Sequence, residues 1–372
     1  MINDLFYAVD QRKTFSKIQA LNWANGDISK IHFCAMDSAF DSCDWARPKA
    51  SWESLLRARC QQLRDQYDYL CLWFSGGWDS TTVLNAFAEN SIKLDEVCIY
   101  QRKFIDDNEP GSAALYAAQI KNHYLPDLKI TFIDIDHTHC DSVYGKYQQD
   151  WIMTPGCNLM FPKLHRWFLH TDLNEVQQIK KIKNRNRVDI EAHDKPRVIL
   201  YQNRWYCFFP DVSLINYMGA DVEMFYITPS LPELHISQVH LSIDYMEQQM
   251  SACQRLGDET FSHRVQNSDY QFFKTWNLAI GRSCTDNISA VHGMLKSTTG
   301  QNPISLESQK LAHYSFSSGS QSYKIYQQGL SDVYDITGID VRTGSVLPTI
   351  MSKQWFVRGL NYAVGKGYQQ IA

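Results

Sequence analysis

The sequence lacks the features that mark secreted, membrane-spanning and cysteine-rich metal proteins. No apolar run approaches the roughly 18 residues that a membrane helix needs, and no basic leader precedes an apolar stretch near Met1. Ten cysteines are present, but no two form a C-x-x-C pair, which argues against a zinc ribbon, an iron–sulfur cluster and a disulfide framework. We therefore expect a cytoplasmic protein with reduced thiols and no membrane partner.

The chain also lacks a strong excess of either charge. It has 36 Lys and Arg against 40 Asp and Glu, and the formal net charge of -4 gives no global reason to expect nucleic acid as a partner. Hydrophobic residues make up 44% of the chain, which is enough to bury a core and excludes general disorder. A length of 372 residues predicts about two domains.

Helical and strand patterns alternate after residue 50. The spacing of apolar residues predicts helices over 52–66, capped by Ser51, over 79–90, and over 112–122, capped by Ser112. Apolar runs predict strands over 69–74, 94–100 and 129–136. This alternation indicates an α/β fold class with a parallel sheet and right-handed crossovers. Ligands of such sheets bind at the carboxyl ends of the strands, where Ser75, Gln101 and Asp136 would emerge.

Beyond residue 150 the alternation weakens. Helical patterns cover 158–170 and 235–250, and two short strands are predicted on either side of Gln202 and Asn203. From about residue 236 the pattern is mainly helical and carries no recognisable chemistry.

The strongest motif is Ser-Gly-Gly-Trp-Asp-Ser at residues 75–80, between a predicted strand and a predicted helix. Two glycines let the backbone approach an anion closely, and the N–H groups of a helix start favour phosphate. Ser75 and Ser80 add hydroxyl donors. Asp79 repels phosphate by itself, so it implies a magnesium ion that bridges the carboxylate and the phosphates. These residues predict a loop that holds a pyrophosphate group with its metal.

As a whole, this motif resembles the PP-loop of the N-type ATP pyrophosphatases, which include asparagine synthetase, GMP synthetase, NAD synthetase, the deazaguanine nitrile synthase and the tRNA thiolases. It differs from a P-loop because no G-K-[ST] follows. The stretch TPGCNLMF at 154–161 is similar to the P-G-x-N turn of the nitrile synthase, and GADVEMF at 219–225 is similar to the G-A-D-E-x-F stretch of asparagine synthetase. The resemblance covers residues 67–228.

The resemblance implies a domain organisation and a set of site residues. A parallel-sheet, adenine-nucleotide α-hydrolase-like (PP-loop) domain over 67–235 would lie between an N-terminal extension, 1–66, and a mainly helical C-terminal domain, 236–372. The cofactors would be ATP and Mg. The implied nucleotide-binding residues are Ser75, Gly76, Gly77, Trp78, Asp79, Ser80, Gln101, Gly156 and Asn158.

The implied catalytic residues are two acids and a cation. Asp79 and Asp221 would hold Mg through the pyrophosphate, although Val222 separates Asp221 from Glu223, and either acid of that pair could take the role. The cation would meet the charge that develops on the leaving pyrophosphate. Its candidates are Arg102, Lys103, Lys163 and Lys353, from which we take Lys353 as the catalytic one.

The reaction type implied is that of an AMP-forming ligase: ATP adenylates an acceptor oxygen, pyrophosphate leaves, and a nitrogen nucleophile displaces AMP. The first cysteine stands at position 34, so the chain has no match to the N-terminal nucleophile of the asparagine synthetase glutaminase. Free ammonia, a separate subunit or an amine substrate would supply the nitrogen. Two alternatives stay open, namely thiolation or amination of a base in tRNA or DNA, and a non-catalytic module that binds ATP or AMP.

Three further stretches carry two interpretations each. Within DIDHTHCD at 134–141, His137 and His139 could bind zinc together with Cys140 or an aspartate, or the stretch is an ordinary surface loop. KKIKNRNR at 180–187, flanked by Glu175, Asp189 and Glu191, could contact the phosphates of tRNA or DNA, or it is a solvated helix end or mobile loop. In TPGCNL, Asn158 either reads a polar edge of the nucleotide or of a small-molecule or nucleobase acceptor, or it caps the following helix.

Overall fold

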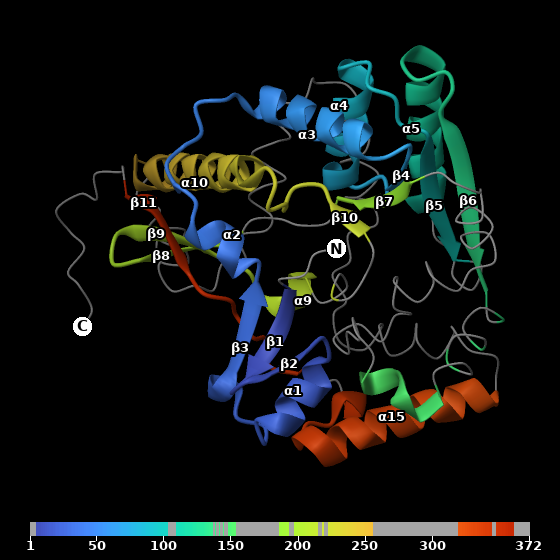
Figure 1. Cartoon of the computed structure of the whole chain (residues 1–372), viewed down its shortest axis with the longest axis vertical. Helices are drawn as coiled ribbons and strands as arrows, with labels where there is room; N and C mark the ends of the chain where they lie inside the picture. Colours follow the sequence, from blue (N-terminus) through green and yellow to red (C-terminus); the bar gives the residue numbers. More distant parts are fainter. Residues whose placement is uncertain are drawn as a thin grey trace.

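The structure is a computed structural model, and it describes residues 5–102, 109–136, 138, 141, 144, 148–153, 186–192, 197–214, 218, 222–255, 319–343 and 347–360. Within these residues the strands form three sheets. Figure 1 shows the central sheet with helices beside it at the upper right, an N-terminal sheet below, and a third sheet at the left. No helix of the described residues is long and apolar enough to cross a membrane.

The central sheet is parallel throughout. Its strands are β4 (Tyr69–Trp73), β5 (Glu96–Arg102), β6 (Lys129–Ile135), β7 (Arg187–Glu191) and β10 (Val222–Met224). They lie in the order β10-β7-β4-β5-β6, and every neighbouring pair is parallel. The α/β prediction with a parallel sheet is therefore confirmed. The first strand along the chain, β4, lies at the centre, so the strand order reverses between β4 and β7.

Helices α3 (Trp52–Gln66), α4 (Trp78–Glu89) and α5 (Glu109–His123) accompany the central sheet (Figure 1). The Ser51 side chain accepts a hydrogen bond from the Ser54 N–H at 3.2 Å, which confirms the predicted cap of α3. The predicted cap of α5 was wrong, because the helix starts at Glu109 and Ser112 lies in its first turn. Pro110 is compatible with this earlier start, since the first turn of a helix needs no N–H partner there.

The N-terminal sheet is antiparallel, with the order β2-β1-β3. Its strands are β1 (Leu5–Val9), β2 (Arg12–Thr14) and β3 (Ile31–Ala35), and it carries the helices α1 (Lys17–Trp23) and α2 (Asp37–Asp41). Short helical segments elsewhere in the described chain are η1 (Ile28–Lys30), η2 (Gln148–Met153), α9 (Asp211–Leu214) and η4 (Val341–Thr343).

The third sheet joins chain segments that are far apart in the sequence. β8 (Arg197–Tyr201) and β9 (Arg204–Phe208) form an antiparallel hairpin, and β11 (Trp355–Gly359) pairs antiparallel with β9. Gln202 and Asn203 form the two-residue turn with φ values of 46° and 59°, which matches the primed turns that hairpins favour. The two strands predicted around these residues are confirmed, and β11 adds a strand to a range whose pattern is mainly helical.

Two long helices of the later part of the chain are α10 (Pro232–Arg255) and α15 (Gln321–Thr337). α10 confirms the helix predicted over 235–250. It contacts both α3 and β8 and so connects the third sheet with the helices of the central sheet. α15 contacts α1 and η2.

A buried ion pair connects the N-terminal sheet to later segments. The Lys17 ammonium lies 2.7 Å from the Asp211 carboxylate, and both side chains are buried. The Tyr7 hydroxyl donates to the same carboxylate at 2.9 Å, and the Ile350 N–H donates to its other oxygen at 3.1 Å. Asp211 therefore joins α1, β1 and the segment that precedes β11.

Gly329 of α15 packs closely against the Trp151 ring. The Trp151 indole N–H donates to the Ile325 carbonyl at 3.2 Å, and a β-carbon built on Gly329 would lie 2.2 Å from that indole nitrogen. We expect Gly329→Ala to lower the free energy of unfolding by about 1–3 kcal/mol, because a buried ring cannot yield easily. Urea denaturation would measure this.

Gly111→Ala is the matched control, because Gly111 is also helical and a β-carbon added there would meet nothing within 4 Å. That variant should keep or gain stability, since alanine favours a helix over glycine by about 0.5–1 kcal/mol. Equal stability of the two alanine variants would show that α15 does not pack on Trp151 as described.

Candidate active site

The Ser75–Ser80 motif forms the connection between β4 and α4. The Phe74 N–H donates to the Cys98 carbonyl at 2.9 Å, so pairing with β5 extends one residue past β4 before the loop starts. Gly76 has φ 69°, in the left-handed region that side chains with a β-carbon disfavour. Gly77 is the N-cap of α4. The predicted strand, glycine turn and helix are thus confirmed at the carboxyl end of the central strand.

Hydroxyl and amide groups converge in this loop. The Ser75 and Ser80 hydroxyl oxygens lie 3.3 Å apart, and the Gly77 N–H donates to Ser75 Oγ at 3.3 Å. Ser80 Oγ donates to the Gly77 carbonyl at 3.2 Å. Gly77 has no side chain with which to cap α4, so the first-turn N–H groups and the positive end of the helix dipole remain directed at the loop. Such a helix start is suited to an anion.

Asp79 lies in the first turn of α4 and is half-buried. Its backbone carbonyl accepts a hydrogen bond from the Tyr226 hydroxyl at 2.8 Å, across 147 positions of sequence. Tyr226 is itself buried and stacks on Trp52 with ring centroids 6.1 Å apart. The structure therefore brings the residue that follows GADVEMF into contact with the Ser-Gly-Gly-Trp-Asp-Ser loop.

Of the two acids of GADVEMF, Asp221 and Glu223, the structure describes only Glu223. The Glu223 carboxylate accepts hydrogen bonds from Arg59 Nη2 at 2.7 Å and from the Tyr67 hydroxyl at 2.8 Å. Arg59 is buried and also donates to the backbone carbonyls of Met224 and Phe225, so this group fixes α3 against β10. Glu223 is thus engaged in holding the fold. Asp221 lies outside the described residues.

Gln101 emerges near the carboxyl end of β5, as predicted, and is half-buried. It pairs in register with Asp134 of β6. One residue earlier, Tyr100 stacks on Trp73 of β4 with centroids 4.8 Å apart, so aromatic rings join the ends of the two strands next to the loop. Asp136, which follows β6, is also half-buried.

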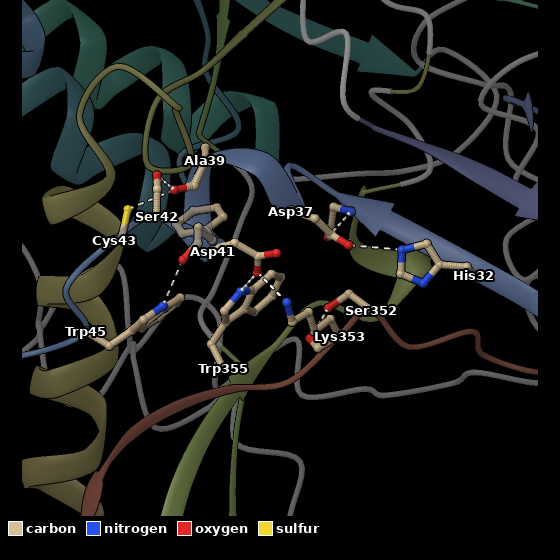
Figure 2. A network of polar contacts seen from close by, with 12 residues as sticks. His32, Asp37, Ala39, Asp41, Ser42, Cys43, Trp45, Ser352, Lys353 and Trp355 are labelled. Carbon is tan, nitrogen blue, oxygen red and sulfur yellow. Dashed lines mark hydrogen bonds and ion pairs between the residues drawn. The ribbon is translucent and has the colours of Figure 1, made fainter.

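Lys353 lies elsewhere. Its ammonium pairs with the Asp41 carboxylate of α2 at 2.7 Å, and the Trp355 indole donates to the same oxygen at 2.8 Å (Figure 2). β11, which begins two residues after Lys353, lies on the opposite side of the molecule from β4 (Figure 1). The structure shows no contact between Lys353 and the loop within the described residues.

Several predicted site residues lie outside the described part of the chain. They are Gly156, Asn158, Lys103, Lys163, Asp221, His137, His139 and Cys140, together with the side chains of Trp78 and Arg102. The suggested zinc loop at 134–141 and the acceptor turn at 154–159 therefore stay predictions.

Arg187, the last basic residue of KKIKNRNR, is the first residue of β7 and only 7% of its side chain is exposed. Its guanidinium bonds Glu96 at 3.0 Å and Asp189 at 2.8 Å. This arginine therefore neutralises buried acids at the amino end of the sheet instead of offering its charge to a nucleic acid. Residues 180–185 lie outside the described residues.

Glu191 is a candidate that sequence reasoning missed. It is the last residue of β7 and only 4% exposed. The register pairs Leu72 with Ile190, so Glu191 ends its strand beside Trp73, two residues before Ser75. In the sequence it is a flanking acid of the basic stretch, and only the strand order could place it at the reversal point between β4 and β7.

Comparison with known proteins does not assign the chain to a family: no protein-family model matches it, and no curated protein matches it.

Proposed function

We propose that the protein is an ATP pyrophosphatase of the PP-loop type, which adenylates an acceptor oxygen and then transfers nitrogen to it. The observation that carries this proposal is the placement of the Ser75–Ser80 loop. It follows the central strand of a parallel sheet, at the point where strand order reverses, and it leads into a helix whose N-cap residue, Gly77, makes no side-chain hydrogen bond. Ligands of doubly wound sheets bind at such points.

The loop suits a pyrophosphate in several ways. Gly76 turns the backbone without a β-carbon, the start of α4 offers N–H groups, and Ser75 and Ser80 offer hydroxyls. These donors would stabilise the negative charge that gathers on the leaving pyrophosphate, which is where such groups accelerate a reaction most.

Two acids near this edge are candidates for holding a magnesium ion. Asp79 supplies a carboxylate at the start of α4, and Glu191 supplies a second one at the end of β7. Carboxylate oxygens together with nucleotide phosphates are the ligands that magnesium usually takes. When bound, the ion would neutralise phosphate charge and so let Asp79 lie beside the pyrophosphate.

The proposed reaction has two steps. The acceptor oxygen attacks the α-phosphorus of ATP, the bond to the bridging oxygen breaks, and pyrophosphate leaves with the electron pair. An amine or ammonia nitrogen then attacks the activated carbon, loses a proton, and AMP leaves. The chain's part in the first step is to orient the triphosphate along the loop and hold the leaving group.

Product analysis tests the proposal. We expect purified protein, given magnesium, ammonium, ATP labelled at the γ-phosphate and a metabolite extract as acceptor source, to release labelled pyrophosphate and AMP. The same reaction with EDTA in excess over magnesium is the control and should release neither. Formation of ADP and labelled phosphate would contradict the assignment, because a PP-loop positions the bond between the α- and β-phosphates for cleavage.

A further inference from the structure

A second group of chemically reactive side chains lies in the N-terminal sheet, away from the loop. His32 and Cys34 are two residues apart on β3, so both project from the same face of that strand. Asp37 begins α2 directly after it. His32 Nε2 lies 3.0 Å from Asp37 Oδ2, and the imidazole, thiol and carboxylate ligand atoms all lie within 4.8 Å of one another.

The backbone between these residues is shaped to bring them together. Met36 has φ 57° and ψ 38°, a left-handed conformation that is uncommon for a residue with a β-carbon. This bend returns the chain so that Asp37 faces His32 (Figure 2). The Ala35 N–H donates to Asp37 Oδ1 at 3.0 Å, which orients the carboxylate and leaves Oδ2 directed at the imidazole.

We propose that His32, Cys34 and Asp37 bind a zinc ion. Imidazole nitrogen, thiolate sulfur and carboxylate oxygen are the three ligand types that zinc takes in proteins. Bond lengths of about 2.0–2.3 Å around a tetrahedral ion place its ligands roughly 3.3–3.6 Å apart, so small side-chain rotations would close the present triangle on the ion.

The proposed zinc site would leave one coordination position of the ion free. Three protein ligands leave the fourth position of the ion for water or a substrate oxygen, and the His32 side chain is 54% exposed, which gives solvent a route to it. Asp41, one helical turn after Asp37, is already neutralised by Lys353 and bonded by Trp355, so it does not supply the fourth ligand (Figure 2). Zinc with one thiolate and one carboxylate is formally neutral, so the site would need no further counter-charge.

A second triad shows why ligand types alone do not make a metal site. Cys71, Glu96 and Cys98 also lie within 4.8 Å of one another, with the two sulfurs 3.3 Å apart. However, the Glu96 oxygens already accept from Arg187, Thr131 and Tyr69 and pair with Lys129. Burial raises the pKa of the Cys71 thiol well above its usual range. A buried guanidinium in contact and a thiol that resists ionisation both oppose a cation there.

Zinc binding to chelator-treated, full-length protein tests the inference. We expect zinc chloride, titrated against a chromophoric chelator, to show one tight site per chain. His32→Ala and Cys34→Ser should each weaken it about 100-fold or more, because each removes a ligand. Cobalt(II) in place of zinc should give a thiolate-to-metal absorption band in the wild type that Cys34→Ser abolishes. Neither measurement uses ATP, so the result is independent of the proposed ligase activity.

The matched controls are Cys98→Ser, which alters the other triad, and His123→Ala, an exposed histidine of α5. Both should keep zinc affinity within about twofold of the wild type, since neither residue is a ligand. The double variant His137→Ala/His139→Ala should also keep it. No tight zinc site in the wild type, retention of zinc in His32→Ala/Cys34→Ser, or its loss in His137→Ala/His139→Ala would each overturn the assignment.

Discussion

Asp79→Asn should reduce magnesium-dependent release of AMP and pyrophosphate by about 100-fold or more, since metal and electrostatic contacts to developing charge have effects of that size. Asparagine keeps the shape of the side chain and can still interact with the start of α4, but it loses the charge that holds magnesium against the phosphates. The backbone contact to Tyr226 uses the Asp79 carbonyl and should survive. Initial rates at saturating ATP would measure the effect.

Asp65→Asn is the control for that variant, because Asp65 is an exposed acid of a neighbouring helix and accepts only a surface hydrogen bond from Gln61 in the described contacts. Its rate should match the wild type. Both variants should melt within a few degrees of the wild type. If Asp79→Asn kept full activity at limiting magnesium, Asp79 would have no part in metal binding, and the loop would need a different explanation.

Asp211→Asn should lower the free energy of unfolding by about 3–5 kcal/mol, because it leaves the buried Lys17 ammonium without its counter-charge. Burial lowers the pKa of Lys17, and the Asp211 charge and hydrogen bond raise it in part. In the variant only the penalty of burial would remain. Denaturant titration, followed by far-UV circular dichroism, would measure the change.

Lys17→Met combined with Asp211→Asn should recover part of that loss, since no unpaired charge would then be buried. Asp340→Asn is the matched control at the surface, where Asp340 pairs with the exposed Arg342 and its loss should hardly move the melting temperature. A double variant no more stable than Asp211→Asn would show that the hydrogen bonds from Tyr7 and Ile350, and not the ion pair, account for the contribution of Asp211.

Local patterns in the sequence predict the strand, loop and helix from Tyr69 to Glu89, because an apolar run and paired glycines constrain the backbone wherever the segment lies. The hairpin at Gln202 and Asn203 follows for the same reason. In contrast, the pairing of β11 with β9 could not be predicted, because no residue pattern near Trp355 indicates that its partner is Cys207, far earlier in the sequence.

The candidate site divides in the same way. Ser75, Gly76 and Ser80 can be found from sequence because their spacing carries the chemistry. Glu191 escapes such reasoning because its role depends on which strands are neighbours, and strand order is decided by packing over the whole sheet. Lys353 is a candidate for the catalytic cation only because it is basic. The sequence does not show which acid will lie beside a lysine, and in the fold Lys353 pairs with Asp41.

The third sheet also limits the order in which parts of the chain can fold during synthesis. β8 and β9 can form their hairpin once residue 208 has been made, but β9 then presents one row of backbone N–H and C=O groups with no strand beside it. That edge can be paired only after residues 355–359 have left the ribosome. By then the residues of all five strands of the central sheet have been synthesised. During synthesis, therefore, the hairpin keeps the outer edge of β9 unpaired until β11 has been made. The third sheet is then the last sheet of the described fold to be completed.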